Sequence, residues 1–197
     1  MTGVPVRVSS KVFYSRICVG NHANSHRHTF RPTFEIKMNY SDRLKNIRGI
    51  AFDFDGVFTD NRVLVMESGE EAVFCDRSDG MGISLLRESQ VPMVVISTEK
   101  NPVVSMRASK LQIHCEQGVD DKLSVLRKWA TETGLDLSET AFVGNDINDV
   151  ECLKAVGLGV AVADAYEPAK SSAELVLTRP GGRGAVREFA DLLLATR

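Results

Sequence analysis

The most informative stretch of the chain reads Ile50-Ala51-Phe52-Asp53-Phe54-Asp55-Gly56-Val57-Phe58-Thr59-Asp60. An apolar strand that ends in two carboxylates at a spacing of two places Asp53 and Asp55 on the same side of the strand end, where a parallel sheet opens its ligand crevice. Two like charges so close together repel, so the pair needs a cation or a proton to offset them. Magnesium (Mg2+) suits this position because it prefers hard oxygen ligands and keeps water that a phosphate can replace. Taken alone, the pair is equally consistent with two aspartates that only solvate a strand end.

Two further segments place candidate phosphate-binding groups at the end of a strand or the start of a helix. Val94-Val95-Ile96 leads into Ser97 and Thr98, whose hydroxyls can donate to phosphate oxygens. Lys122 follows Asp120-Asp121 at the start of a helical pattern, where it can offer a point charge to a phosphate together with the helix N-terminus. A serine after a strand is common, and a solvated surface lysine is the simpler interpretation of Lys122 by itself.

A later segment repeats the first pattern. An apolar strand beginning at Ala141 runs into Gly144 and then delivers the side-chain oxygens of Asn145, Asp146 and Asp149 into a loop and a helix start. These oxygens can complete a metal shell begun by the first two aspartates. The sequence therefore predicts one site, assembled at several strand ends, that holds magnesium and a phosphate.

Composition limits the classes of partner. The 197 residues suit one domain, and a net charge of -2 with 25% charged residues shows no basic excess that would favour nucleic acid. Four widely spaced cysteines without a CxxC pair favour reduced thiols and a cytoplasmic location. No apolar stretch approaches the roughly 18 residues that span a bilayer. We expect a small-molecule partner and no membrane association.

The first 40 residues differ from the rest. Ser, His, Asn, Arg and Thr dominate there without a sustained period, so we expect residues 1–40 to be a poorly ordered extension. A tail or an over-long start is the simpler interpretation, and a transit peptide is the alternative. From residue 47 onward short apolar runs alternate with helical patterns, which predicts an α/β domain over residues 41–197. Its expected fold is a parallel sheet flanked by helices.

The expected elements follow from these patterns. Strands are predicted at Gly49–Phe54, Met93–Ser97, Ile113–Glu116, Ala141–Gly144, Leu158–Val162 and Leu175–Val176. Helices are predicted at Met81–Ser89, Pro102–Lys110, Lys122–Thr133, Asp146–Val156, Pro168–Ser172 and Gly184–Ala195. The segment Arg62–Phe74 reads as a β-hairpin with a polar tip at Glu67-Ser68-Gly69-Glu70.

In order and spacing these residues resemble the four motifs of the haloacid dehalogenase superfamily of phosphohydrolases. The motifs are Asp53 to Val57, Ser97, Lys122 and Gly144 to Asp149. The resemblance implies a Rossmann-like parallel sheet with helices on both faces. It implies that Asp53 is the nucleophile and becomes an aspartyl phosphate, while Asp55 acts as general acid and then as general base. It also implies that Ser97 and Lys122 hold the phosphoryl oxygens beside a magnesium ion.

One position departs from the family pattern. The fourth motif usually has an aspartate directly after the glycine, and this chain has Asn145. An amide oxygen can bind magnesium but carries no charge, so metal affinity should fall unless Asp146 or Asp149 compensates.

The spacing of the motifs indicates a branch of the family without a cap domain. About 40 residues separate Asp55 from Ser97, and the hairpin and one helix fill them. This layout resembles the branch typified by 3-deoxy-D-manno-octulosonate 8-phosphate phosphatase and the phosphatases of nonulosonate 9-phosphates. The resemblance extends to Asp79-Gly80-Met81-Gly82-Ile83, Val162-Ala163-Asp164-Ala165 and Gly181 to Glu188. It implies a homotetramer in which hairpins pack together and a neighbouring subunit covers the site.

The same resemblance supplies the expected substrate contacts, which are Thr59, Asp79, Arg183 and Arg187. An arginine in the mobile loop from Gly181 to Gly184 can pair bidentately with a carboxylate or a phosphate. Surface charge at the start of a helix explains Arg183 and Arg187 equally well.

The leading hypothesis is a magnesium-dependent phosphatase acting on a sugar-acid phosphate, either 3-deoxy-D-manno-octulosonate 8-phosphate or an N-acylneuraminate or other nonulosonate 9-phosphate. Asn145 motivates a rival of another class, a non-catalytic oligomerisation domain related to the C-terminal domain of acylneuraminate cytidylyltransferases. A third hypothesis is a phosphatase of another small metabolite, or a phosphotransferase that uses the same aspartyl phosphate.

Overall fold

A computed structural model describes residues 40–197, so the expectations for residues 1–39 lie outside the described part of the chain. The described part opens with a short helix, α1 (Tyr40–Asn46), which the sequence patterns did not predict. Leu44 buries its side chain in the core, and Lys45 donates to Asp42 one turn earlier at 3.0 Å. A single buried residue in seven leaves too weak a periodicity to detect from sequence.

Six parallel strands form the central sheet in the order β5-β4-β1-β6-β7-β8. Their bounds are β1 (Gly49–Phe52), β4 (Met93–Ile96), β5 (His114–Glu116), β6 (Thr140–Gly144), β7 (Leu158–Ala161) and β8 (Leu175–Val176). Every residue of β1, β6 and β7 is buried, because helices cover both faces of the sheet. The predicted Rossmann-like α/β fold is confirmed.

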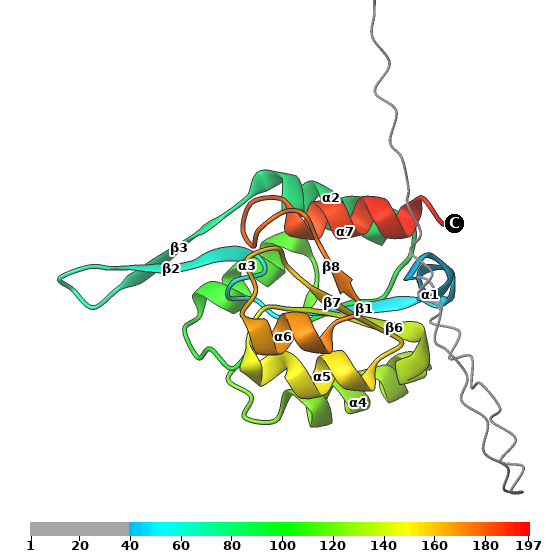
Figure 1. Cartoon of the computed structure of the whole chain (residues 1–197). Helices are drawn as coiled ribbons and strands as arrows, with labels where there is room; N and C mark the ends of the chain where they lie inside the picture. The colour runs from blue at the N-terminus through cyan, green and yellow to red at the C-terminus, as the bar shows by residue number, and fades with distance from the viewer. Residues whose placement is uncertain (1–39) are drawn as a thin grey trace, which may run out of the picture. The chain divides into compact units, whose positions relative to one another are not determined.

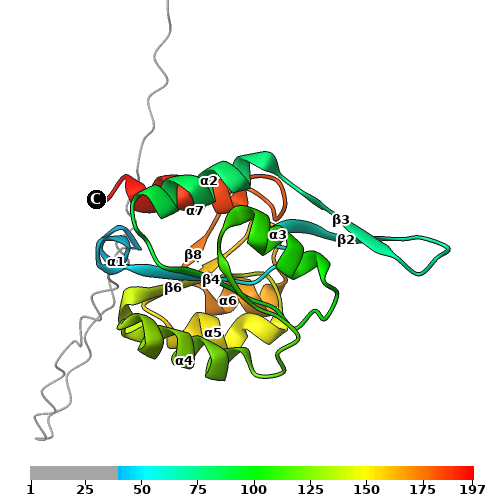
Figure 2. The same cartoon turned by 180° about the vertical axis from the view of Figure 1, so that it is seen from behind.

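The helices form two layers around this sheet (Figures 1 and 2). On one side lie α2 (Arg77–Glu88), α3 (Val103–Leu111) and α7 (Ala185–Leu194), and on the other lie α4 (Lys122–Thr133), α5 (Val150–Ala155) and α6 (Glu167–Ser172). The helix α7 packs along α2 and buries Phe189 and Leu193 completely. Gly82 permits this packing, because a Cβ there would lie 2.9 Å from Arg187 Cα. None of the helices in residues 40–197 has the length and apolar character needed to cross a bilayer.

An antiparallel hairpin, β2 (Thr59–Val65) and β3 (Glu71–Cys75), leaves the domain between β1 and α2 and projects away from it (Figure 1). Within the described residues, this hairpin and α2 account for the chain between β1 and β4, with no inserted domain. Its register pairs Val63 with Val73 and Leu64 with Ala72. Side chains alternate across a strand, so Val63 and Val73 share one face of the ribbon while Leu64 and Phe74 share the other.

Most helix ends lie within one residue of the sequence prediction, and two helix starts differ by more for identifiable reasons. α2 starts at Arg77 rather than Met81, because the Asp76 carboxylate accepts from the backbone N–H of Ser78 at 2.7 Å and caps the helix earlier. The predicted helix Asp146–Val156 is instead a 3-10 turn, Ile147–Asp149, followed by α5. There the Asp149 carboxylate folds back onto the backbone N–H groups of residues 145 and 146 and tightens the first turn.

The strand β1 also ends two residues earlier than predicted. Its last ladder contact is the Asp53 N–H donating to the carbonyl of Val143 at 2.9 Å. A helical turn follows at once, since the N–H of Phe58 donates to the carbonyl of Phe54 at 2.9 Å. Phe54 and Phe58 therefore stack against each other in the core instead of extending the strand.

Candidate active site

The site lies where the carboxyl ends of the three neighbouring strands β4, β1 and β6 meet. Asp53 follows β1, Ser97 follows β4 and Asn145 follows β6, while Lys122 begins α4 after β5. In an open parallel sheet, ligands bind at the carboxyl edge where the strand order reverses direction, and here it reverses at β1. The sequence motifs thus converge at one edge of the sheet, as their positions predicted.

A buried ion-pair cluster forms the centre of the site. Lys122 Nζ lies 2.7 Å from Asp53 Oδ1 and 2.8 Å from Asp149 Oδ1. All three side chains are almost completely excluded from water, so the simpler interpretation of Lys122 as a solvated surface lysine is wrong. One ammonium group offsets two carboxylates here, which leaves the cluster with a net negative charge.

The pKa values of the cluster reflect this imbalance. Burial, and then the Asp149 carboxylate, raise the pKa of Asp53 to about 7 although Lys122 acts in the opposite direction. Burial lowers the pKa of Lys122, but the carboxylates of Asp53 and Asp149 outweigh this and raise it. Because the pKa of Lys122 is raised, this lysine keeps its charge. Asp53 is therefore the group whose ionised form an additional cation would stabilise.

The position of the Asn145 amide shows whether a cation fits beside Asp53. One of its two amide heavy atoms lies 3.2 Å from Asp53 Oδ2 and 3.0 Å from the main-chain oxygen of Asp55. With Nδ2 in this position the amide donates to both oxygens, and with Oδ1 there three oxygen atoms face one another. Octahedral magnesium with bonds of about 2.0–2.1 Å separates adjacent ligand oxygens by about 2.9 Å. These three groups, which we call the oxygen triplet, therefore have the spacing and chemistry of a magnesium site.

The other predicted metal ligands are engaged differently. Asp149 Oδ1 accepts from Lys122, and its Oδ2 accepts from the backbone N–H groups of Asn145 at 2.8 Å and Asp146 at 3.3 Å. Asp146 Oδ1 accepts from the N–H of Ile147 at 2.6 Å. Among residues 40–197 no three His, Cys, Asp or Glu side chains surround a common point. Asp55 contributes its main-chain oxygen to the oxygen triplet, and its carboxyl group takes no part in it.

The turn after β1 fixes the Asp55 carboxyl group. Gly56 adopts a φ of 76°, and a Cβ there would lie 2.0 Å from the Asn145 amide, so only glycine fits. Thr59 is fully buried, and its hydroxyl accepts from the N–H of Gly56 at 3.1 Å and donates to Asp55 Oδ1 at 3.5 Å. Burial, followed by the charge of Glu99, raises the pKa of Asp55. The structure thus gives Thr59 a part in shaping the turn, and its contact with substrate stays a prediction.

The two predicted hydroxyl groups differ in their surroundings. Ser97 is buried beyond the end of β4, and its oxygen accepts from the N–H of Glu99 at 3.1 Å. Its hydroxyl hydrogen is thereby left to donate to another group. Thr98 is exposed and has no side-chain hydrogen bond within the described residues. Ser97 is the better placed of the two for a phosphate.

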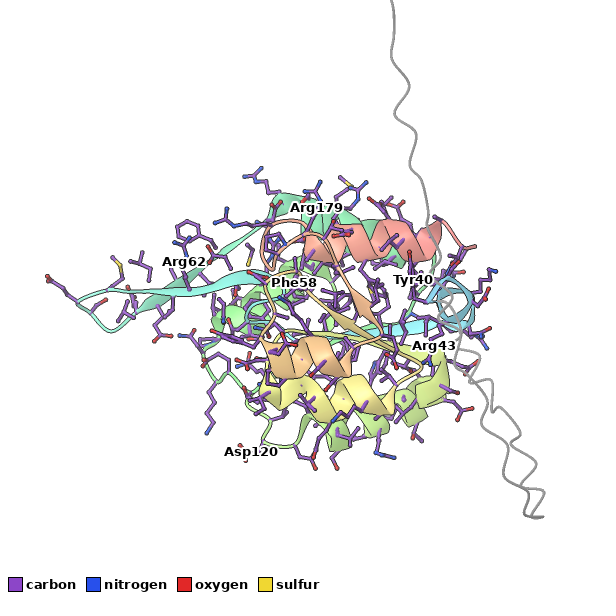
Figure 3. The ribbon with its side chains drawn as sticks, in the orientation of Figure 1. Tyr40, Arg43, Phe58, Arg62, Asp120 and Arg179 are labelled. Carbon is purple, nitrogen blue, oxygen red and sulfur yellow. The ribbon has the colours of Figure 1, made fainter. Side chains whose placement is uncertain are left out.

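Asp55 also lies at the edge of a cleft of about 290 Å3 that sequence reasoning did not find. Its remaining lining residues are Asn61, Arg62, Val63, Glu71, Val73, Glu99, Asn101 and Val103. Asn101 Nδ2 donates to Glu71 Oε2 at 3.0 Å and so ties the hairpin to the loop after β4. Figure 3 shows Arg62 on the hairpin close to where it leaves the domain. The only sequence signal for this cleft was the alternation of side chains in the hairpin. That alternation predicts two faces but not which part of the domain either face contacts.

The predicted substrate contacts outside the motifs lie elsewhere. Asp79 is fully buried between α2 and α7, where its carboxylate accepts from the N–H groups of Gly184 at 3.3 Å and Arg187 at 3.0 Å. The guanidinium of Arg187 pairs with Asp191 at 2.8 Å on α7. Arg183 is exposed and lies 3.9 Å from Asp60 Oδ2. Only Arg183 remains free to meet a ligand, and Asp79 has a structural role.

Known proteins resemble this chain in sequence and in structure. A family model described as haloacid dehalogenase-like hydrolase matches residues 99–187. The 3-deoxy-D-manno-octulosonate 8-phosphate phosphatase KdsC of Yersinia pestis is 36% identical over 153 residues, which cover 77% of this chain and 82% of the relative. Its solved structure has a TM-score of 0.78 at 34% identity, covering 81% of this chain and 86% of that one.

The corresponding phosphatase of Moraxella catarrhalis has been solved in complex with magnesium, phosphate and the sugar acid KDO. It is similar to this chain with a TM-score of 0.78 at 31% identity, covering 81% of this chain and 93% of that one. The rival hypothesis of a non-catalytic domain finds no support in the site, because the charged cluster around Lys122 is intact. On both sequence and structure, the chain belongs to the haloacid dehalogenase-like hydrolases and is a phosphatase.

Proposed function

We propose that the protein is a magnesium-dependent phosphomonoesterase that uses Asp53 as its nucleophile and acts on a sugar-acid phosphate. Candidate substrates are 3-deoxy-D-manno-octulosonate 8-phosphate and an N-acylneuraminate or other nonulosonate 9-phosphate. The observation that carries the proposal is the oxygen triplet next to the Asp53–Lys122 ion pair. The oxygen triplet supplies a cation site on one side of the buried Asp53 carboxylate, and Lys122 supplies a phosphate-binding charge on the other.

Each group of the site has one task in the proposed reaction. Asp53 Oδ2 belongs to the oxygen triplet, so Oδ1 is the oxygen left to attack phosphorus. Bond formation between Oδ1 and phosphorus accompanies cleavage of the bond to the leaving oxygen, which takes the proton of Asp55 as it departs as an alcohol. Asp55 then accepts a proton from the water that attacks the aspartyl phosphate. Phosphate leaves, and the Asp53 carboxylate is restored.

The surrounding residues hold the phosphoryl group and the metal. Lys122 and Ser97 bind its oxygens, and Lys122 also orients Asp53 and partly offsets the rise in its pKa that burial causes. Asp53, the main-chain oxygen of Asp55 and Asn145 would hold magnesium. The bound ion supplies charge neutralisation for the approach of a carboxylate to a phosphate dianion. The raised pKa of Asp55 suits a general acid, which must carry a proton near neutral pH.

The cleft beside Asp55 favours a polyhydroxylated leaving group. Amide and carboxylate side chains, among them Asn61, Glu71, Glu99 and Asn101, line its walls and can accept or donate hydrogen bonds. Arg62 is its single cationic residue and is held in place by two hydrogen bonds to Asp60. A polyhydroxylated sugar matches these polar groups, and Arg62 is the one guanidinium in the lining that a carboxylate of the sugar could reach. The Moraxella catarrhalis relative bound to KDO supports the same class of substrate.

The hairpin supports a homotetramer in which a neighbouring subunit covers the site. Leu64, Phe74 and their neighbours expose apolar side chains on a two-stranded ribbon, which is at best marginally stable in water without a partner. Because this face of the ribbon is opposite to the one that lines the cleft, it can pack against another hairpin while the inner face stays open to substrate.

Phosphate release tests the proposal. Purified protein with magnesium should release phosphate from an octulosonate 8-phosphate or a nonulosonate 9-phosphate faster than from an aryl phosphate. Asp53→Asn should reduce kcat by at least about a thousandfold, because an amide is a poor nucleophile. Asp120→Asn, which removes an exposed carboxylate near Lys122, is the matched control and should retain activity. If the wild-type protein releases no phosphate from any of the three, the proposed activity is wrong.

A further inference from the structure

Three segments beyond the four motifs have no role in the proposed reaction, and the structure brings them together. They contain Asp79 in α2, Asp164 after β7, and the loop of residues 181–184, which we call the glycine loop. Hydrogen bonds from the backbone of the glycine loop end on both carboxylates. All three segments therefore take part in one arrangement, which holds the glycine loop in place.

The glycine loop lies directly against the turn that carries Asp55. The N–H of Gly182 donates to the carbonyl of Val57 at 3.0 Å. A Cβ at Gly181 would lie 1.8 Å from the carbonyl oxygen of Gly56, and one at Gly182 would lie 2.4 Å from backbone atoms of residues 59 and 60. Glycine is therefore required here for contact between two backbones.

Two carboxylates hold the glycine loop in this position from opposite sides. Asp164 Oδ1 accepts from the N–H of Gly181 at 2.9 Å. Asp79 accepts from the N–H groups of Gly184 and Arg187 and so binds the first turn of α7, where the loop ends. The loop is thus fixed at both ends by side chains and in its middle by the catalytic turn.

We propose that Asp164 and Asp79 are positioning residues that act through the glycine loop to hold Asp55 at its place in the reaction. The inference rests on the proposed function for its kinetic part only. Misplacement of a proton donor by a fraction of an ångström slows the chemical step far more than it weakens phosphate binding, which depends on Lys122. Loss of an anchor should therefore appear in kcat rather than in KM.

Asp164 gives the sharper test, because it is exposed and its replacement should leave the domain folded. Asp164→Ala removes the acceptor, and we expect kcat to fall roughly tenfold with KM within about twofold of the wild type. Asp164→Asn keeps an acceptor oxygen and should restore most of kcat. Asp191→Ala removes an exposed carboxylate from α7 without touching the loop and serves as the control.

Amide hydrogen exchange reports on the same anchor without using activity. In Asp164→Ala, the N–H groups of Gly56, Val57 and Phe58 should exchange about tenfold faster than in the wild type and in Asp191→Ala. Unchanged exchange together with unchanged kcat would overturn the inference. So would equal impairment of Asp164→Asn and Asp164→Ala, since charge rather than the hydrogen bond would then matter. If the wild type proves inactive, the proposed function fails, and the exchange rates alone decide the positioning role.

Discussion

Lys122 Nζ lies 2.7 Å from Asp53 Oδ1 with both side chains buried, so the proposed nucleophile is held by a cation that water cannot reach. The same ammonium group contacts Asp149 at 2.8 Å, which in turn binds the backbone at Asn145. Phosphate binding, the nucleophile and the fourth motif are therefore connected through one side chain. A change at Lys122 should affect stability as well as catalysis.

Lys122→Met should lower the free energy of unfolding by about 3–5 kcal/mol at neutral pH, because it leaves two buried carboxylates without a cation. Urea unfolding measures the change. Lys128→Met is the matched control on the same helix, where the ion pair with Glu132 spans 3.8 Å and is exposed, and it should change stability by less than about 0.5 kcal/mol. Equal effects of the two substitutions would contradict the role of the cluster in the fold.

Asn145→Asp should raise the affinity for magnesium, since it adds a charge to the oxygen triplet. Without metal the same change should lower the melting temperature, because a further buried carboxylate then faces Asp53. Calorimetric titration and thermal melting measure the two effects, and an increase in affinity of at least about tenfold is expected. Asn148→Asp adds the same charge to an exposed position of the same loop. If both variants gain equally, the gain reflects net charge and not ligation.

The pKa of Asp53 predicts how metal binding depends on pH. Burial and Asp149 raise that pKa from 3.8 to about 7, so the folded protein without metal holds a proton that the unfolded chain has already released. This contribution to stability is complete below the unfolded pKa and is lost as pH rises through about 7. Magnesium requires the ionised carboxylate, so its stabilising effect should be larger near pH 8 than near pH 5.5. Thermal melting with and without magnesium at both values checks this, and the opposite order would contradict it.

The sequence predicted the fold class well because the buried strands are short, continuous apolar runs. β1 and β6 are each followed directly by a polar residue, Asp53 and Asn145, and the place of these residues at the carboxyl edge followed from the parallel topology alone. The start of α2 could not be predicted in the same way, since it depends on a hydrogen bond from Ser78 to Asp76 rather than on periodicity. In the sequence, Gly80 and Gly82 also suggest a helix boundary. Only the structure shows that both lie inside α2 and that Gly82 permits α7 to pack against it.

The site was predicted where motifs define it and missed where tertiary contacts define it. Asp79 was predicted to contact the substrate, and only the packing of α7 shows that its side chain is buried. Arg62 and Glu99 are ordinary surface residues in the sequence, and they line the cleft only because the hairpin folds over the loop after β4. Asn145 was expected to hold the metal more weakly than an aspartate would, and the structure places its amide 3.2 Å from Asp53 Oδ2, where it can serve as such a ligand.

The exposed face of the hairpin provides the last prediction. Leu64 is 51% exposed and Phe74 is 69% exposed, on the face of the ribbon that does not line the cleft. Replacing both by aspartate should prevent packing between hairpins, because it would place four charges at each contact of two ribbons and remove the apolar area that stabilises it.

Light scattering should therefore show that Leu64→Asp/Phe74→Asp has a lower mass than the wild-type assembly, while circular dichroism shows an intact domain. Tyr40→Asp is the control, since it places the same charge on an exposed aromatic position at the end of the domain away from the hairpin (Figure 3).

Activity of the dissociated variant adds a second criterion. If a neighbouring subunit covers the site, the dissociated variant should lose kcat/KM for a sugar-acid phosphate and retain more of it for an aryl phosphate, because only the larger leaving group reaches beyond the cleft. A variant that keeps the wild-type mass would show that the hairpin is not the assembly surface. A dissociated variant with unchanged kcat/KM would show that each subunit forms its site alone.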